Sequence, residues 1–554
     1  MDMIDSLSRK RKTPLKKLPY RYNAYKNNDQ KSCSGCFLDQ SKTICFRSCL
    51  LVAGAVLGFS LGDASEAFAS DPLPPETQIQ RDREKLGNST LVVSQTDPAA
   101  ARDSRVVSTT TSESGEDKLD TSGNLLGDMG GLRTWLYKYG VTFNLQEFDE
   151  LWGNVSGGTS GKPAYIGVTA PSIEVDLEKL IGLKGGRFNV SALQTRGRSI
   201  SAEQLSVYNP VSGFEADRST RLFELWYQQS LFGDKLDIKI GQQDLDTEFL
   251  ISDYGALYLN ANFGWPMAPS VNLYGGGPAW PLASPAIRFR YRPTNQLTFM
   301  FAAAADNPSG HSFYNADNPT NQSVHKDGAN FNMRSGALLI AELQYSINPQ
   351  PEDMSKATED PGLPGIYRLG GFYDTGRFPD QRYDTNGGLL ASPDSDGNPM
   401  MHRGNWMIYG IIDQMIWRPS LSSPTSLGIF VRPTGNGGDR NLVSFAIDAG
   451  FNLKAPFPER ENDTLGLAWG MGRTSSRQRA YDRDLRNFNL GTYQPISHDE
   501  HHIELTYQAQ VTPWMVLQPD LQYIVNPSRG VLNPNTGRRV GNEVVFGLHS
   551  NITF

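Results

Sequence analysis

The chain has few cysteines and lacks long apolar runs. All four cysteines (Cys33, Cys36, Cys45 and Cys49) lie within the first fifty of its 554 residues. The spacing Cys33-x-x-Cys36 has no second pair that would complete a zinc site. After residue 70, no stretch approaches the roughly 18 consecutive apolar residues of a membrane-spanning helix. These absences exclude a helical membrane protein and a fold held by disulfides or zinc.

The N-terminal residues differ in kind from the rest. Residues 1–49 are rich in lysine and arginine, residues 50–59 are apolar, and Ala67, Phe68 and Ala69 form an A-x-A cleavage pattern. This order predicts a cleaved secretory signal peptide over 1–69, with an extended basic start. Residues 1–69 hold 11 of the 52 basic and 6 of the 59 acidic side chains, so residues 70–554 carry a net charge of about −12. An acidic protein of this kind is a poor partner for nucleic acid.

Residues 70–125 are rich in serine, threonine, aspartate and proline and have few aromatics. Such a segment cannot bury enough apolar surface to fold alone, so we expect a disordered periplasmic tether. Residues 130–140 are expected to form a short helix before the first strand. The third predicted domain, a barrel, covers 126–554.

The last residues of the chain predict a membrane β-strand. Val544, Phe546, Leu548, Ser550 and Ile552 alternate with smaller or more polar residues up to the C-terminal Phe554. A period of two places alternate side chains on opposite faces of a strand. One face then suits hydrocarbon and the other suits water, which is typical of the closing strand of an outer-membrane β-barrel.

Segments of this kind recur about sixteen times. The expected strands are 141–151, 170–178, 185–195, 219–231, 234–243, 285–292, 296–306, 333–347, 364–375, 404–418, 425–433, 440–453, 462–472, 500–511, 514–525 and 541–554. Their lengths match the 9–11 residues or so of a tilted spanning strand. Long connections (196–217, 244–284, 307–332, 376–403 and 473–499) alternate with mostly short ones. The pattern predicts an all-β, antiparallel transmembrane barrel with short periplasmic turns and long extracellular loops.

Alternation assigns faces in five of these strands. The residues expected to face lipid are Phe223, Leu225, Tyr227, Ile287, Phe289, Tyr291, Leu343, Tyr345, Ile347, Ile503, Leu505, Tyr507, Leu517, Leu521 and Tyr523. Those expected to face the lumen are Glu224, Trp226, Gln228, Arg288, Arg290, Arg292, Glu342, Gln344, His502, Glu504, Gln508, Gln518, Asp520 and Gln522. The predicted lumen is polar and carries both signs of charge.

Several motifs together resemble the carbohydrate-selective porins of the OprB type. They are Gly127-Asp-Met-Gly-Gly-Leu-Arg133, Glu224-Leu-Trp-Tyr-Gln-Gln229, Ile240-Gly-Gln-Gln-Asp244, Leu363–Gly376, Asp439-Arg-Asn441, Glu504-Leu-Thr-Tyr507 and Pro513–Pro527. The match covers about 127–554 in order, although Met129 stands where tryptophan is expected. The resemblance implies a monomeric sixteen-stranded barrel through which sugars such as glucose diffuse passively across the bacterial outer membrane.

A diffusion channel selects solutes by its diameter and by the groups that line it. Loop 244–284, with Asp246, Glu248 and Asp253, is the first candidate for the constriction. The predicted pore-lining residues are Glu224, Trp226, Arg288, Arg290, Glu342, Gln344, Arg196, Arg198, Glu504 and Asp520. We expect no enzymatic activity, no cofactor and no metal. The expected partners are small neutral sugars, outer-membrane lipid with lipopolysaccharide, and the barrel-assembly machinery, which would recognise Phe554.

Other functions are less well supported. The stretch 156–162 resembles a P-loop, but its first glycine is missing and Pro163 follows the lysine. The histidines of 498–502 lie at the end of an expected external loop. A barrel enzyme such as a lipase needs a Ser/His/carboxylate set that we cannot assemble from this sequence. A structural or adhesive barrel whose 70–125 segment binds cell wall is the remaining alternative.

Overall fold

The computed structural model describes residues 109–111, 117–309, 326–349, 360–491, 493–533 and 535–554. The predicted signal peptide, the four cysteines and most of the predicted tether lie outside these residues. Within 70–125, two short strands, β1 (Thr109–Thr111) and β2 (Asp117–Leu119), pair antiparallel.

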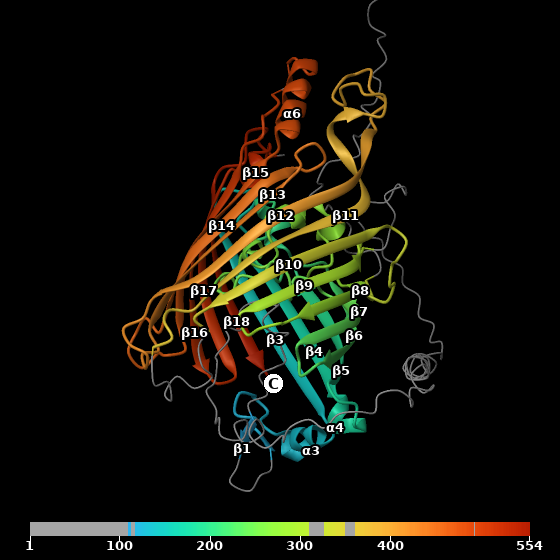
Figure 1. Cartoon of the computed structure of the whole chain (residues 1–554). Helices are drawn as coiled ribbons and strands as arrows, with labels where there is room; N and C mark the ends of the chain where they lie inside the picture. Colours follow the sequence, from blue (N-terminus) through green and yellow to red (C-terminus); the bar gives the residue numbers. More distant parts are fainter. Residues whose placement is uncertain (1–108, 112–116, 310–325, 350–359, 492, 534) are drawn as a thin grey trace, which may run out of the picture. The chain divides into compact units, whose positions relative to one another are not determined.

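The other strands form one closed antiparallel barrel in which each strand pairs with its neighbours in sequence (Figure 1). They are β3 Val141–Ser156, β4 Ala164–Asp176, β5 Gly186–Gly197, β6 Ser219–Leu231, β7 Leu236–Gln243, β8 Ser284–Tyr291, β9 Leu297–Ala305, β10 Ala337–Ile347, β11 Gly365–Asp384, β12 Pro399–Trp417, β13 Ser426–Asn436, β14 Val443–Lys454, β15 Thr464–Thr474, β16 Glu500–Thr512, β17 Met515–Val525 and β18 Glu543–Thr553. The predicted fold is confirmed. The main boundary differences are an earlier start of β4 and the prolongation of β11 and β12 beyond the expected spans.

The C-terminal strand closes the barrel as the alternation predicts. β18 pairs with β17 on one side and with β3 on the other, from Val544 opposite Ser156 to Thr553 opposite Gln146. Phe546 is 50% exposed on the outer face, while His549 is fully buried on the inner face. Closure satisfies the backbone hydrogen bonds that an open sheet edge would leave unpaired.

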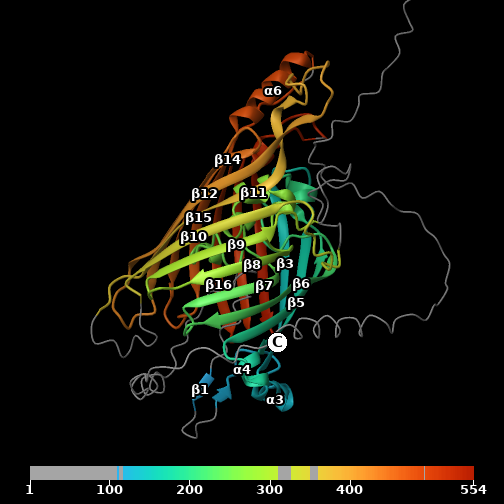
Figure 2. The ribbon, with the colours of Figure 1, turned by 45° about the vertical axis from the view of Figure 1, so that its right-hand side comes forward.

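The two ends of the barrel differ. At one end the prolonged hairpin of β11 and β12 and helix α6 (Ser476–Phe488) extend beyond the other strands (Figures 1 and 2). Arg382 of β11 bonds to Asp484 of α6 at 2.7 Å. This end carries the long connections, so it is the end expected to be extracellular. Among the described residues no helix is long and apolar enough to cross a membrane.

The opposite end carries short turns, the C-terminus and the predicted N-terminal helix. The helix is present as α3 (Leu132–Lys138), preceded by η2 (Met129–Gly131); α4 (Leu177–Ile181) lies between β4 and β5. Arg133 of α3 is buried and donates to the backbone oxygens of Phe143 and Phe554. The helix is thereby fastened to both strands at the seam of the barrel.

A bulge in β6 corrects one predicted face. Val190 pairs with Leu225 but Ala192 pairs with Leu222, so Phe223 and Glu224 both stand opposite the single residue Ser191. The extra residue shifts the alternation. Phe223, predicted to face lipid, is instead 2% exposed and packs in an interior cluster. A bulge cannot be read from alternation alone, because it interrupts it.

Two long connections fold into the barrel and fill much of its interior. Residues 198–218 include the π-helical turn η3 (Ser201–Leu205). Residues 244–283 include η4 (Gly255–Leu257), η5 (Ala261–Phe263), α5 (Met267–Asn272) and η6 (Tyr274–Gly276). Their apolar side chains pack against those of the wall in all three buried clusters. The last short helix, η8 (Pro527–Arg529), lies between β17 and β18.

Glycines on the wall let the 244–283 loop approach closely. A Cβ added to Gly466 of β15 would lie 2.5 Å from Leu257, one added to Gly472 would clash with Met267, and one added to Gly428 of β13 would clash with Tyr254. Glycine inside a strand often marks a close approach of this kind. The loop therefore fits a depression in the β13–β15 wall.

Candidate functional site: the lumen and its inward loops

Acidic side chains of the wall bind the backbone amides of the 244–283 loop. Glu504 accepts from the amides of Leu259 and Asn260 at 2.6 and 3.0 Å. Glu342 accepts from the amide of Leu250 at 3.1 Å and from the Tyr409 hydroxyl at 2.7 Å. Asp413 accepts from the Ser252 hydroxyl at 2.6 Å and from the amide of Asp253 at 3.2 Å. These carboxylates hold loop residues that belong to no regular element.

Arg432 of β13 binds the carbonyls of the same loop. Its guanidinium donates to the oxygens of Leu250 (2.7 Å), Asn262 (2.6 Å), Phe263 (2.9 Å) and Gly264 (2.8 Å). It also pairs with Asp448 of β14 at 3.1 Å, and both side chains are fully buried. One arginine thus satisfies four carbonyls that a buried irregular segment would leave unpaired.

Next to the start of the loop, cationic wall residues pair with acids. Glu248 pairs with Lys239 at 2.8 Å and with Arg288 at 2.5 Å. Burial alone would raise the pKa of the Glu248 carboxyl, but these cations hold that pKa well below its usual range. The Lys239 ammonium also lies 4.4 Å from the centre of the Trp226 ring. Two cations thus share the single carboxylate of Glu248.

A cavity lies between the wall of β3–β6 and the inward loops. Three aromatic rings form one side of it: Phe148 lies 4.7 Å from Phe214, and Phe214 lies 6.0 Å from Trp280. Polar side chains also line it: Asn144, Gln146, Ser172, Asn189, Ser191 and Glu224. Its mixture of apolar and polar groups is typical of the lining of a small-molecule site.

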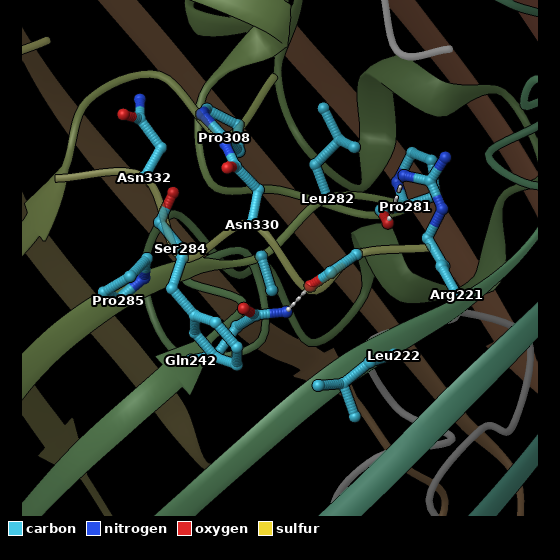
Figure 3. A pocket seen from close by; sticks show the side chains of 13 residues that line it. Arg221, Leu222, Gln242, Pro281, Leu282, Ser284, Pro285, Pro308, Asn330 and Asn332 are labelled. Atoms are coloured by element: carbon cyan, nitrogen blue, oxygen red, sulfur yellow. Dashed lines mark hydrogen bonds between the residues drawn. The ribbon is translucent and has the colours of Figure 1, made fainter. Parts of the chain in front are cut away.

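A second, smaller cavity lies where β6 and β7 stop pairing (Figure 3). Beyond this point, residues 327 and 328 bond to the two strands. The backbone carbonyl of Asp327 accepts from the amide of Leu222, and the side-chain amide of Gln242 donates to the carbonyl of Gly328. Arg221 donates to the carbonyl of Pro281 at 3.3 Å, as Figure 3 shows. Segment 280–282 separates the two cavities, since Trp280 lines the larger one and Pro281 and Leu282 line this one.

Nine of the ten predicted pore-lining residues fall into three groups. Glu224 lines the larger cavity. A second group faces inward but is engaged by neighbours: Arg288 with Glu248, Arg290 with Asp237 at 2.8 Å, Gln344 with Glu342 at 2.7 Å, Asp520 with Gln522 at 2.9 Å, Trp226 beneath Lys239, and Glu342 and Glu504 with the loop. Arg198 is exposed at the extracellular end of β5.

The placement predicted for Arg196 is wrong. Its Cα pairs with Gly167, and its side chain bonds to Glu147 and Asp149, which alternate with the inward-facing Phe148 and Glu150. Arg196 therefore lies on the outer wall of the barrel. A strand-to-loop junction does not fix the face of a residue, and no clean alternation surrounds this arginine.

Sequence reasoning missed most of the cavity lining, including Phe148, Phe214, Trp280 and Asn189. A signal existed for β3, where Asn144, Gln146, Phe148, Glu150 and Trp152 recur every second residue. The alternate positions Glu147 and Asp149 are charged, so both faces of the strand carry polar residues. Alternation therefore cannot show which face points into the lumen. Phe214 and Trp280 come from loops, whose paths no local pattern predicts.

The loop 198–218 contains a titratable group beside the larger cavity. Glu215 accepts from the Ser201 hydroxyl at 2.6 Å and from the Ser201 amide at 3.0 Å, and also from Ser199. Burial raises the pKa of Glu215 to about 7, although these hydrogen bonds lower it, and Glu150 adds a further upward contribution. The carboxyl group therefore titrates near neutral pH.

Comparisons with known proteins agree with this architecture. The family model described as carbohydrate-selective porin, OprB family, matches residues 160–554. Porin B of Pseudomonas aeruginosa is 26% identical over 450 residues, which are 78% of this chain and 91% of that protein. The high-pH structure of Pseudomonas putida OprB aligns with a TM-score of 0.65 and 24% identity, covering 79% of this chain and all of that one.

Proposed function

Because the chain belongs to the carbohydrate-selective porin, OprB, family, we propose that it is a passive diffusion channel for mono- and oligosaccharides such as glucose. Members of this family are channels of the outer membrane rather than enzymes. The sugars would pass on the β3–β6 side of the lumen, through the larger cavity. The opposite side is occupied by the 244–283 loop and its bonds to the wall.

The observation that carries this proposal is the pairing of aromatic and polar groups around one cavity. Sugar rings have apolar faces that suit Trp280, Phe214 and Phe148. Their hydroxyl groups donate and accept, so they can exchange hydrogen bonds with Asn189 and Gln146. Such contacts are weak enough to release the solute, which conduction requires.

The set of residues predicted from the sequence to contact the sugar is reduced accordingly. Glu224 and the half-buried Trp226 remain candidates for sugar contact, and Arg288 and Arg290 shape the wall through their pairs with Glu248 and Asp237. Glu342, Gln344, Glu504 and Asp520 would act indirectly, by holding the loop or one another. Arg198, exposed at the extracellular rim, would meet solutes before they enter.

We further propose that the chain is exported through cleavage of 1–69 and inserted by the barrel-assembly machinery, which would bind the terminal Phe554. The apolar outer wall, with residues such as Phe546 and Leu548, supports contact with outer-membrane lipid and lipopolysaccharide. Loss of insertion on Phe554→Ala, with normal export, would support recognition of this residue.

Purified protein in planar bilayers tests the channel. We expect open channels whose current glucose partly blocks, and liposomes that swell faster in glucose than in amino acids of similar size. Trp280→Ala should weaken the glucose block while channels still form. The matched control is Trp469→Ala, on the outer face of β15. Absence of conductance, or equal effects of both substitutions, would contradict the proposal.

A further inference from the structure

A fully buried carboxylate lies at the extracellular end of the seam that closes the barrel. Glu543 is the first residue of β18, and its side chain faces inward, as does that of Val545 two residues later. Glu543 is 0% exposed, and neither of its carboxylate oxygens has a hydrogen-bond partner. A buried ionised carboxylate needs hydrogen bonds, an opposite charge or a metal ion, because its lost hydration is otherwise uncompensated.

The protein groups around Glu543 supply no such charge. Ile524, which lies opposite it on β17, is buried and apolar. The charged group that acts on Glu543 is Glu500 of β16, which has the same sign and is also buried. Glu500 already accepts from the amides of Tyr208 and Ser528, at 3.1 and 2.6 Å. The two carboxylates therefore make this end of the seam a favourable place for a cation.

Amide oxygens without donors belong to the residues that approach the same point. A Cβ added to Gly158 would lie 3.3 Å from Oε1 of Glu543, 2.7 Å from Nδ2 of Asn154 and 2.6 Å from the backbone oxygen of Gln204. Oδ1 of Asn154 and Oε1 of Gln204 are buried and have no hydrogen-bond partner. Asn154 is 8% exposed and Gln204 is 5% exposed. Both carboxylate oxygens and two amide oxygens thus lack donors.

The turn after β3 holds these groups in place. Nδ2 of Asn154 donates to the backbone oxygens of Gly157 and Ser160, at 3.0 and 2.9 Å. These two bonds fix which side of the amide carries the nitrogen, so Oδ1 is the atom left without a partner. The backbone oxygen of Gln204 accepts from the amide of Thr159 at 2.6 Å. The donor oxygens therefore belong to a braced turn rather than to a loose loop.

We propose that Glu543, Asn154 and Gln204 bind a calcium ion at the extracellular end of the β18–β3 seam. Carboxylate and amide oxygens are ordinary ligands of Ca²⁺, which takes roughly six to eight oxygens in a flexible geometry and completes its shell with water. The site has neither histidine nor cysteine, which does not suit a transition metal. The charge of the ion would also offset the repulsion between Glu543 and Glu500.

The ion would join parts of the wall that are distant in sequence. Asn154 belongs to β3, Glu543 to β18 and Gln204 to the inward loop 198–218, which also carries Phe214 of the larger cavity. It would therefore clamp the closing seam to that loop. This site departs from the sequence-based expectation of no metal, because amide ligands so far apart form no motif. The proposal does not depend on which solute passes through the channel.

Calorimetric titration of the purified, EDTA-treated barrel with calcium chloride tests the site. We expect the parent to bind calcium and to unfold at a higher temperature with it. Glu543→Gln should weaken the binding at least about tenfold, because calcium affinity depends on the charge of the ligands. Asp394→Asn, at an exposed carboxylate of an extracellular loop, is the matched control and should bind like the parent. No binding by the parent, or equal binding by the parent and Glu543→Gln, would overturn the proposal.

The stability of Glu543→Gln separates a bound ion from a protonated carboxyl group. In EDTA the variant should unfold at a higher temperature than the parent, because it no longer buries an uncompensated charge. In calcium the order should reverse. The same order in both solutions would show that the parent keeps Glu543 neutral, which would refute the site.

Gln204→Met provides a second variant that keeps the side-chain length and removes only the amide group. It should weaken calcium binding while channels still form, and unchanged calcium affinity would exclude Gln204 as a ligand and refute the proposed set. Calcium binding is read by calorimetry and sugar passage by current block, so either proposal can fail while the other stands.

Discussion

The two sides of the lumen use similar side chains in opposite ways. On the β10–β17 side, Glu342, Asp413, Arg432 and Glu504 are buried and bonded to the 244–283 loop. On the β3–β6 side, Asn144, Gln146 and Asn189 face a cavity together with aromatic rings. The first side is charged and closed; the second is mostly uncharged and open.

The difference shows that a charged wall does not by itself identify the path of a solute. An irregular loop buried in a lumen has amides and carbonyls that need partners. Ionised side chains are strong partners for both kinds of group. The charged wall residues therefore lie where the amides and carbonyls of the loop need hydrogen-bond partners. Neutral amides and aromatics remain where a neutral solute can bind and leave.

Among the substitutions considered, removal of Arg432 should most strongly reduce the difference between the two sides of the lumen. Arg432→Met removes the cation that pairs with Asp448, which keeps only its hydrogen bond from Asn262, and removes the donor of four loop carbonyls. Loss of one member of a buried ion pair typically costs about 3–5 kcal/mol. We expect a lower free energy of unfolding in urea and a larger single-channel conductance as the loop loosens. Arg292→Met, at a part-exposed site, is the control and should cost about 1 kcal/mol or less. A conductance unchanged by Arg432→Met would show that the loop does not set the width of the channel.

Adding Asp448→Leu to Arg432→Met separates two causes of this effect: the lost hydrogen bonds of the loop and the burial of a carboxylate without its cation. The double variant removes the orphaned carboxylate, so it should recover part of the lost stability. Conductance should remain raised, because the loop carbonyls still lack their donor. Full recovery of both properties would instead assign the effect to charge burial alone.

Overfilling the glycine depression should have the next largest effect. Gly466→Val places side-chain atoms where Leu257 and Tyr258 now lie. Overpacking of this kind typically costs about 1–3 kcal/mol. We expect reduced stability in urea and displacement of the loop, detected as faster proteolysis within 244–283. Gly435→Ala, whose added Cβ meets nothing within 4 Å, is the control. Equal proteolysis of both variants would contradict a close loop contact at β15.

The same contrast explains what could be predicted from the sequence. Strand positions followed from alternation because lipid outside and polar groups inside impose a period of two on nearly every strand. Inward-facing residues such as Arg288, Glu342 and Glu504 were placed correctly for that reason. Their partners were not predictable, since they lie on loops far away in the chain. Glu504 and Leu259, for example, are 245 residues apart.

Two features of the structure interrupt the two-residue alternation on which these predictions depend. The bulge at Phe223 and Glu224 shifted the faces of β6 by one residue. On β3 both faces carry polar residues, because one face lines the cavity and the other carries Glu147 and Asp149, which pair with Arg196. Local sequence therefore predicts the strands of the wall. It does not predict which side of the lumen stays open, because that depends on the positions of the loops 198–218 and 244–283.

On the open side, smaller effects are expected because each contact is a single neutral hydrogen bond. Asn189→Leu should weaken glucose block of the channel roughly fivefold, which corresponds to about 1 kcal/mol for one such bond. Gln194→Leu is the matched control on the outer face of the same strand. The current-block titration should show no change for it. If both variants bind glucose like the parent, the cavity is not where the sugar is recognised.

The smallest effect is a pH dependence from Glu215 beside the open cavity. Its folded pKa of about 7 lies above the ordinary value of 4.5, so the folded protein binds the proton more tightly between these values. Stability is then highest below pH 4.5 or so and falls as pH rises through about 7. Glu215→Gln should remove this contribution, so the urea stabilities of parent and variant should diverge between pH 4.5 and 7.5. The parent should lose more than the variant over that interval. Parallel curves would mean that Glu215 titrates as an ordinary exposed carboxyl group.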